Sequence, residues 1–284
     1  MLIGVSTHIH VRSPLDERLL RRLKDAGFET VELYANPPHW PDYDRAASRR
    51  EIAQICLDID LPINSVHSPF FRSLDEARAG RWLSLSGRDP ATRRESVSRI
   101  IESMAIAEYA PVGCSVVHLG ATGEAEDAGT FERLHYSLEE LLPAARELGV
   151  PVALENITND FSRGHRIADF LAESGLEGLG CCYDCGHAAI YGRTVEELEE
   201  MAPRLLSTHI HDTTDGLDNH LMPFAGEIDW PALTAALAAT GYDGALVIET
   251  KDDDSEPATI TESAEAARRL RGMIERAGER REED

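Results

Sequence analysis

Lysine, cysteine and long apolar runs are scarce in this sequence of 284 residues. Lys24 and Lys251 are its only lysines, and 51 acidic residues against 28 basic ones give a formal net charge of −23. Affinity for nucleic acid comes mainly from Lys and Arg side chains that neutralise phosphates, so this balance argues against a nucleic-acid partner. No apolar run approaches the roughly 18 residues that a helix needs to cross a bilayer, and we expect no membrane segment.

The five cysteines are too few, and odd in number, for a disulfide framework in a chain of this length. Cys182 and Cys185 have C-x-x-C spacing, but they fall in an expected strand, where positions three apart point to opposite faces. We therefore expect small buried residues there rather than a metal or redox motif. Residues 1–6 are typical of a strand and lack a basic flank and a cleavage site, so we expect a cytoplasmic protein without a signal peptide.

The chain alternates short apolar runs with longer amphipathic stretches, the pattern of a parallel sheet covered by helices. Helical patterns include residues 130–148, which end at Gly149, and a helix opened by Asp229 as its N-cap. Eight strands, each followed by a helix, predict an α/β fold, a single (β/α)8 TIM barrel. The expected strands are Leu2–Ser6, Thr30–Tyr34, Ile63–His67, Ser115–Leu119, Val152–Glu155, Gly180–Asp184, Ser207–His211 and Ala245–Glu249.

An open doubly wound sheet is the alternative to a barrel, but it usually has a glycine-rich turn after the first strand. Here residues 7–10 are Thr-His-Ile-His. We expect the barrel to span residues 1–276, followed by a charged tail over 277–284 that frays. The segment Phe70–Pro90 is longer than a usual βα loop and contains Trp82, so it could cover the site.

Six consecutive strand candidates end in a residue that could bind a metal. In a barrel, functional groups lie at the C-terminal ends of the strands, so these six side chains should converge. One such residue is usually structural, but buried carboxylates must pair, become protonated or bind a metal. Mixed carboxylate and imidazole ligands suit Mn2+, Zn2+, Co2+ or Fe2+, and Mg2+ less well. The six residues are His67, His118, Glu155, Asp184, His211 and Glu249.

Strand seven carries two histidines, His209 and His211, which share one strand face because one residue separates them. His211 lies at the expected end of the strand. The sequence therefore favours His211 as the metal ligand and His209 as a deeper supporting group.

Several stretches resemble the xylose-isomerase-like barrel superfamily of sugar isomerases and epimerases, which also contains endonuclease IV. The likeness spans nearly the whole chain. In members that resemble ketose 3-epimerases and inosose dehydratases, four residues hold one divalent metal, and a further histidine contacts substrate hydroxyls. The resemblance implies that the histidine is His187 and that the ligands are Glu155, Asp184, His211 and Glu249. The stretches are Ser65–Pro69, Ala153–Asn156, Asp184–His187 and His211–Trp230.

The chain is also similar to endonuclease IV, and that resemblance implies five further metal ligands: His67, His118, His187, Asp218 and His220. Two features count against it. The run after His211 is Asp-Thr-Thr, where endonuclease IV has an Asn-Asp/Glu-Ser/Ala-Lys run after its histidine. Residues 221–230 instead resemble the Pro-Gly-Glu-Gly-x-Ile-Asp-Trp loop of the sugar isomerases, interrupted by Phe224 and Ala225. The net charge is a second argument against DNA.

The resemblance implies a divalent-metal-dependent isomerase or epimerase of a sugar, sugar phosphate or inosose that acts through an enediolate. Glu155 and Glu249 would exchange the proton from opposite faces of the substrate carbon, and a dehydratase could use the same groups. The alternatives are an endonuclease IV-like phosphodiesterase with a trinuclear zinc site and a non-catalytic sugar-binding barrel. The expected partner is a small sugar or polyol, and the sequence leaves a homo-oligomer open.

Overall fold

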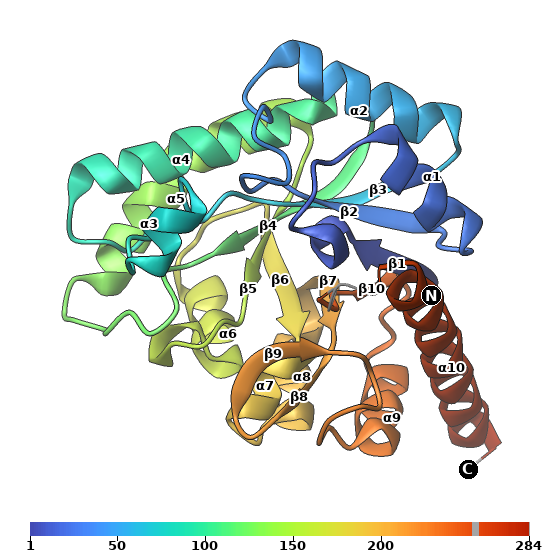
Figure 1. Ribbon diagram of the computed structural model, residues 1–284. Helices are drawn as coiled ribbons and strands as arrows, with labels where there is room; N and C mark the ends of the chain where they lie inside the picture. The colour runs from blue at the N-terminus through green and yellow to red at the C-terminus, as the bar shows by residue number, and fades with distance from the viewer. Residues whose placement is uncertain (252–255, 284) are drawn as a thin grey trace.

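Eight parallel strands close into a barrel in the computed structural model, which describes residues 1–251 and 256–283 (Figure 1). The strands pair in the order β1-β10-β7-β6-β5-β4-β3-β2, so β1 meets both β10 and β2. The predicted single (β/α)8 barrel is confirmed. The strands are β1 (Leu2–Ser6), β2 (Thr30–Tyr34), β3 (Ile63–His67), β4 (Val112–His118), β5 (Val152–Glu155), β6 (Leu179–Asp184), β7 (Leu205–Ile210) and β10 (Ala245–Ile248).

Four of the strands, β1, β2, β3 and β5, have the predicted bounds. β4, β7 and β10 each end one residue earlier than predicted, at His118, Ile210 and Ile248. After β7 this early end precedes a change of direction. The chain then turns into a short antiparallel hairpin that the sequence did not indicate. This hairpin consists of β8 (Asp212–Thr214) and β9 (Leu217–Leu221).

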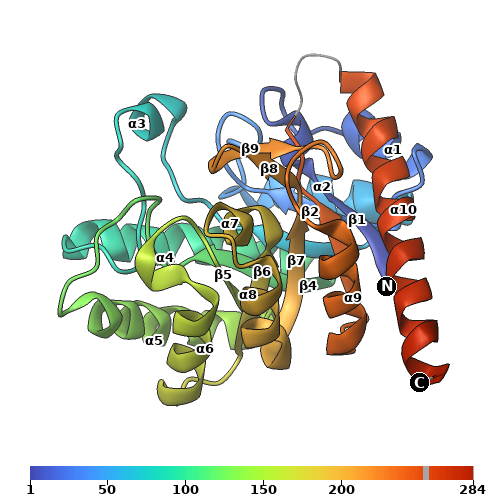
Figure 2. The same cartoon turned by 90° about the horizontal axis from the view of Figure 1, so that it is seen from below.

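Helices surround the barrel and cover the outer faces of the strands (Figures 1 and 2). Gly149 ends α5 in the left-handed conformation at φ 70°, as predicted. The Asp229 side chain accepts a hydrogen bond from the Ala232 amide at 3.0 Å, which confirms it as an N-cap. The helices are α1 (Glu17–Asp25), α2 (Ala46–Asp58), α3 (Leu74–Arg78), α4 (Pro90–Met104), α5 (Thr130–Leu148), α6 (Gly164–Glu173), α7 (Cys185–Ile190), α8 (Thr194–Met201), α9 (Trp230–Thr240) and α10 (Glu256–Glu283), with 3-10 turns at Thr7–His10, Ala105–Glu108, Asp160–Ser162 and Ala202–Arg204.

The C-terminal segment differs from the predicted fraying tail. Residues 277–283 continue α10, which runs beside β1 and packs against α9. The apolar side chains of Leu270, Ile274 and Ala277 recur at helical spacing, and all three are buried. This stripe extends the helix past the expected boundary at 277.

Two insertions rise from the same side of the barrel, α3 in the segment after β3 and the β8–β9 hairpin after β7 (Figure 2). Both follow the C-terminal ends of strands, where barrel enzymes place their sites. All five cysteines are free and buried, as expected for Cys182 and Cys185, but only Cys182 lies in a strand, because Cys185 begins α7. No helix in the described ranges combines the length and apolar composition that crossing a membrane requires.

Candidate metal centre and active-site pocket

Strand alternation carries three functional side chains into the mouth of the barrel. Cys114, Val116, Ala153 and Cys182 form a small apolar cluster of their own. The intervening residues, such as Val117, Leu154 and Cys181, belong to the main core instead. Two residues after Val116, Ala153 and Cys182, on the same strand faces, lie His118, Glu155 and Asp184. These three are the last residues of β4, β5 and β6.

One candidate metal centre consists of Glu155, Asp184, His209 and Glu249, whose ligand atoms all lie within 4.8 Å of one another. We call this group the central cluster. All four side chains are buried. His209 Nδ1 lies 3.1 Å from Glu155 Oε1, 3.1 Å from Glu249 Oε2 and 3.8 Å from Asp184 Oδ2. The structure thus brings three of the four predicted metal ligands together, with His209 rather than His211 as the fourth member.

The two histidines of strand seven lie in different surroundings. His209 still pairs in the sheet, opposite Val247 of β10 and Asp184 of β6. His211 follows the last residue of β7 and precedes the hairpin. Its Nε2 lies 3.1 Å from an Asp184 oxygen, and its ring stacks on His220 at a centroid distance of 4.1 Å.

Glu32 on β2 holds His209 from the opposite side and was missed by the sequence analysis. Its Oε2 lies 3.0 Å from His209 Nε2 and accepts a hydrogen bond of 2.8 Å from the Ser65 hydroxyl. If Nε2–H donates to Glu32, Nδ1 keeps its lone pair for a metal, as in carboxylate–histidine–metal arrangements. The sequence feature that could have indicated Glu32 is its position as a single carboxylate inside the apolar run Thr30–Tyr34.

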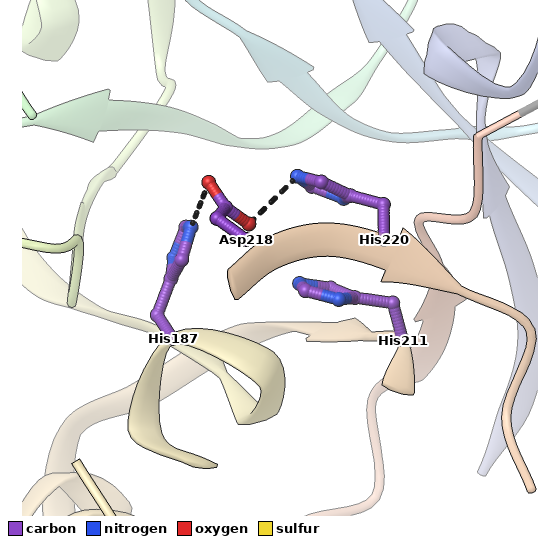
Figure 3. A group of neighbouring side chains, drawn as sticks. All are labelled: His187, His211, Asp218 and His220. Atoms are coloured by element: carbon purple, nitrogen blue, oxygen red, sulfur yellow. Dashed lines mark ion pairs between the residues drawn. The ribbon is translucent and has the colours of Figure 1, made fainter. Parts of the chain in front are cut away.

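A second candidate ligand group lies beside the central cluster and combines His187, His211, Asp218 and His220 (Figure 3). Asp218, from the hairpin, bridges His187 Nε2 at 3.3 Å and His220 Nε2 at 3.2 Å. Burial alone would lower the pKa of His220, but Asp218 and Glu249 outweigh it and raise that pKa to about 9. Asp218 and His220 both lie on β9, so the hairpin brings these two predicted residues to the site.

A third group comprises His67, His118 and Glu155, and two further triads, His8–His220–Glu249 and His67–His209–Glu249, overlap with these three groups. His67 Nε2 lies 3.4 Å and His118 Nε2 3.2 Å from Glu155 Oε2. Glu155 therefore belongs to two groups, with one oxygen facing His209 and the other facing this pair of histidines. All nine predicted site residues lie in one of the three groups.

A cavity of about 600 Å³ opens above these groups. His8 and Tyr34, which the sequence analysis did not single out, also line it. Asp184, His209 and His211 lie beneath the lining and are fully buried. A larger surface groove of about 870 Å³ runs between α5 and α6, but no predicted site residue lines it. The floor of the cavity is formed by His67, His118, Glu155, His187, Asp218, His220 and Glu249.

The central cluster has the chemistry of a divalent-cation site. It places three carboxylates at one buried spot, and their ion-pair partners in the described part of the chain are histidines rather than Lys or Arg. Among the described residues none donates a well-oriented hydrogen bond to the buried Glu155 Oε2. Buried carboxylate oxygens require a partner, and carboxylates with one imidazole suit Mn2+, Zn2+, Fe2+ or Co2+.

The surroundings shift the pKa values of the two candidate catalytic carboxyls, Glu155 and Glu249, in opposite directions. Burial would raise the pKa of Glu155, but His209 and His118 outweigh it and hold that pKa well below its ordinary value. Burial raises the pKa of Glu249 above its ordinary value, against the opposing effect of His209 and His220. Paired carboxyls with diverging pKa values are the usual arrangement for separate base and acid roles.

Comparison with solved structures shows the same fold over nearly the whole chain. A D-tagatose 3-epimerase-like protein has a TM-score of 0.80 at 19% identity, covering 99% of both chains. An L-ribulose 3-epimerase has a TM-score of 0.78 at 21% identity, covering 99% of this chain and 97% of the other. The IolI protein, solved with a zinc atom, has a TM-score of 0.75 at 18% identity, covering 98% and 99%.

Two curated relatives match shorter stretches. The uncharacterized protein y4fM of Sinorhizobium fredii is 33% identical over 156 residues, which cover 53% of this chain and 50% of that protein. The uncharacterized protein MJ1311 of Methanocaldococcus jannaschii is 29% identical over 125 residues, covering 41% and 42%. The chain thus spans half or less of the length of these curated relatives. Residues 20–271 match the model of one family, and the chain belongs to that family, the xylose isomerase-like TIM barrel proteins.

Proposed function

We propose that the protein is a divalent-metal-dependent isomerase or epimerase of a sugar, a sugar phosphate or an inosose. The observation that carries the proposal is the central cluster, whose four ligand residues converge within 4.8 Å beneath an open cavity. The structural similarity to sugar 3-epimerases supports the same class. Mn2+ or Zn2+ suits the donor set best, with Co2+, Fe2+ and Mg2+ as alternatives.

Glu155, Asp184, His209 and Glu249 would hold the metal. When bound, a divalent cation supplies positive charge beside the substrate oxygens that become negative as a proton leaves the carbon next to a carbonyl. Because Asp184 and His209 lie beneath the cavity lining, the substrate reaches the site from the side of Glu155 and Glu249.

Glu155 and Glu249 are the proposed proton-transfer groups. They come from β5 and the end of β10, which are not neighbours in the barrel. Glu155, whose pKa the neighbouring histidines hold below its ordinary value, is proposed to accept the proton, and Glu249, from the other side of the barrel mouth, to take part in its return. A dehydratase would use the same base and expel a hydroxyl group instead of reprotonating the carbon.

The histidines that line the floor are proposed to bind substrate hydroxyls. His67, His118, His187 and His220 border the cavity, and imidazoles can both donate to and accept from hydroxyls. His187 Nδ1 lies 2.9 Å from the Asn156 carbonyl oxygen, and its other nitrogen faces Asp218. This arrangement fixes the ring at the edge of the central cluster, as expected for a substrate contact.

A second candidate function is metal-dependent phosphodiester hydrolysis of the endonuclease IV kind. The specific observation in its favour is that the described residues form five overlapping candidate ligand groups at the cavity rather than one. Clustered metal ions can stabilise both the attacking and the leaving oxygen of a phosphoryl transfer. The net charge of −23 argues against a DNA substrate.

One experiment separates the two candidates. The protein is loaded with Mn2+ or Zn2+, its metal content is measured, and it is incubated in D2O with a panel of ketoses and inososes. We expect deuterium to enter the substrate at a carbon next to the carbonyl, detected by NMR, with a new epimer or isomer. No exchange in any substrate, together with chelator-sensitive cleavage of an abasic-site duplex, would replace the sugar reaction by the phosphodiesterase.

A further inference from the structure

The segment between β3 and α4 builds an apolar side of the cavity that the proposed reaction does not use. Phe70 and Trp82 stack with ring centroids 6.1 Å apart and an interplanar angle of 22°, and Phe71 meets Trp82 edge-on at 6.3 Å. Leu74, on α3, is 39% exposed. All four line the cavity. We call this surface, Phe70, Phe71, Leu74 and Trp82, the aromatic wall.

The aromatic wall is held beside the floor by local hydrogen bonds. The Leu83 amide donates to the Phe70 carbonyl at 2.9 Å and closes the base of the insertion. The Arg72 guanidinium donates two hydrogen bonds, of 2.9 and 2.7 Å, to Glu95 on α4. The Phe70 ring also packs against the His118 ring at 4.5 Å, which joins the wall to the floor.

The two sides of the cavity are suited to different parts of a ligand. The floor offers histidines and carboxylates for hydroxyl groups, whereas the wall offers ring faces and an aliphatic side chain, which bind apolar surface. Cavities of about 300–1,000 Å³ hold drug-sized ligands, so the cavity of about 600 Å³ has room for more than a free monosaccharide.

We propose that the aromatic wall binds a second ring, glycosyl or aryl, attached to the sugar that reacts at the floor. This inference rests on the proposed function, because it assigns the sugar to the metal side of the cavity. A ring joined through the anomeric oxygen locks the anomeric carbon as an acetal, so the reacting carbonyl then lies at another carbon of the sugar. The substrate class is a keto sugar that carries a ring substituent.

Binding of matched glycosides to the Mn2+-loaded protein tests the proposal. Methyl and phenyl β-glycosides of glucose, galactose and mannose are compared by titration calorimetry, and cellobiose is compared with methyl β-glucoside to separate a glycosyl from an aryl ring. We expect the ring-bearing member of at least one pair to bind at least about tenfold more tightly. Trp82→Ala should remove that preference, and Trp82→Phe should restore most of it.

Trp82 is the right position because its ring contacts in the wall are with Phe70 and Phe71 and not with a floor histidine. Tyr136→Ala is the matched control, since it removes a 54% exposed ring on α5 that does not line this cavity. Equal or undetectable binding of the ring-bearing member in every pair, or a preference that survives Trp82→Ala, overturns the proposal. A preference for ring-bearing glycosides without deuterium exchange would refute the proposed reaction but not the role of the aromatic wall. Deuterium exchange without that preference would refute the role of the wall but not the reaction.

Discussion

The floor and the aromatic wall of one cavity are built by opposite means. The central cluster, which reaches the floor through Glu155 and Glu249, comes from the ends of four different strands, and its side chains are almost completely buried and linked by short contacts. The wall comes from one insertion, and Leu74 and Trp82 remain partly exposed. Barrel scaffolds fix reacting groups at strand ends and vary their loops to choose ligands. The contrast suggests that changes to the floor alter chemistry, whereas changes to the wall alter substrate choice.

The largest effect should follow loss of a floor carboxyl. Glu155→Gln and Glu249→Gln should each lower turnover by about 10²–10⁴-fold, the usual size of general acid–base catalysis, while the fold survives. Metal content must be measured in both variants, because a lost metal would also stop the reaction. Turnover within about tenfold of the parent, roughly 1.4 kcal/mol of barrier, in a metal-replete variant would exclude the proton-transfer role of that residue.

The two histidines of strand seven should differ sharply in metal binding. His209→Ala removes a member of the central cluster and should weaken Mn2+ or Zn2+ binding there by more than about 100-fold, beyond the usual cost of losing an outer partner. His211→Ala is the matched control and should leave that site occupied. Competition titration with a chelating dye measures both. The reverse ranking would restore His211 as the fourth ligand.

Loss of the Glu32 carboxylate should lower metal affinity less than loss of a ligand, but more than loss of the Ser65 hydroxyl that donates to it. Glu32→Gln keeps the size of the side chain but removes the carboxylate that faces His209, and we expect metal affinity to fall by about 10–100-fold. Ser65→Ala leaves the Glu32–His209 contact of 3.0 Å in place and should have a smaller effect. Unchanged metal affinity in Glu32→Gln would show that burial alone orients His209.

The smallest effect is expected at the support of the wall. Arg72→Met removes the paired hydrogen bonds to Glu95, and partly exposed ion pairs are worth about 0.2–1 kcal/mol. Affinity for a ring-bearing glycoside should fall a few-fold, while deuterium exchange into a free ketose stays unchanged. Arg88→Met, which breaks the more exposed Arg88–Asp127 pair, serves as control. Loss of exchange in Arg72→Met would mean that the insertion also shapes the floor.

The sequence predicted the barrel and most of the floor because these depend on local patterns. A run of apolar residues that ends in a carboxylate, as in Val152–Glu155, indicates both a strand and the position of its last side chain. The shared direction of parallel strands then predicts that Glu155, Asp184 and Glu249 meet. Endpoints set by local chemistry, such as the N-cap Asp229, were also predictable.

What the sequence did not reveal depends on long-range pairing. His211 lies between the end of β7 and the hairpin that follows, so its contacts with Asp184 and His220 depend on a pairing that no local pattern indicates. Glu32 contacts His209 across 177 positions of the chain, so no local pattern connects them. The packing of α10 against α9 and β1 is also long-range, and it anchors a helix that continues through the charged residues beyond the buried Ala277.

The most direct test of the account is an anomalous difference map from crystals of the Mn2+-loaded protein. We predict a peak bonded to Glu155, Asp184, His209 and Glu249, at distances of about 2.0–2.3 Å. Additional peaks at the group of His187, His211, Asp218 and His220 and at the group of His67, His118 and Glu155 would favour the multinuclear phosphodiesterase. No peak at the central cluster, or a single peak held by His187, His211, Asp218 and His220 alone, would contradict the account.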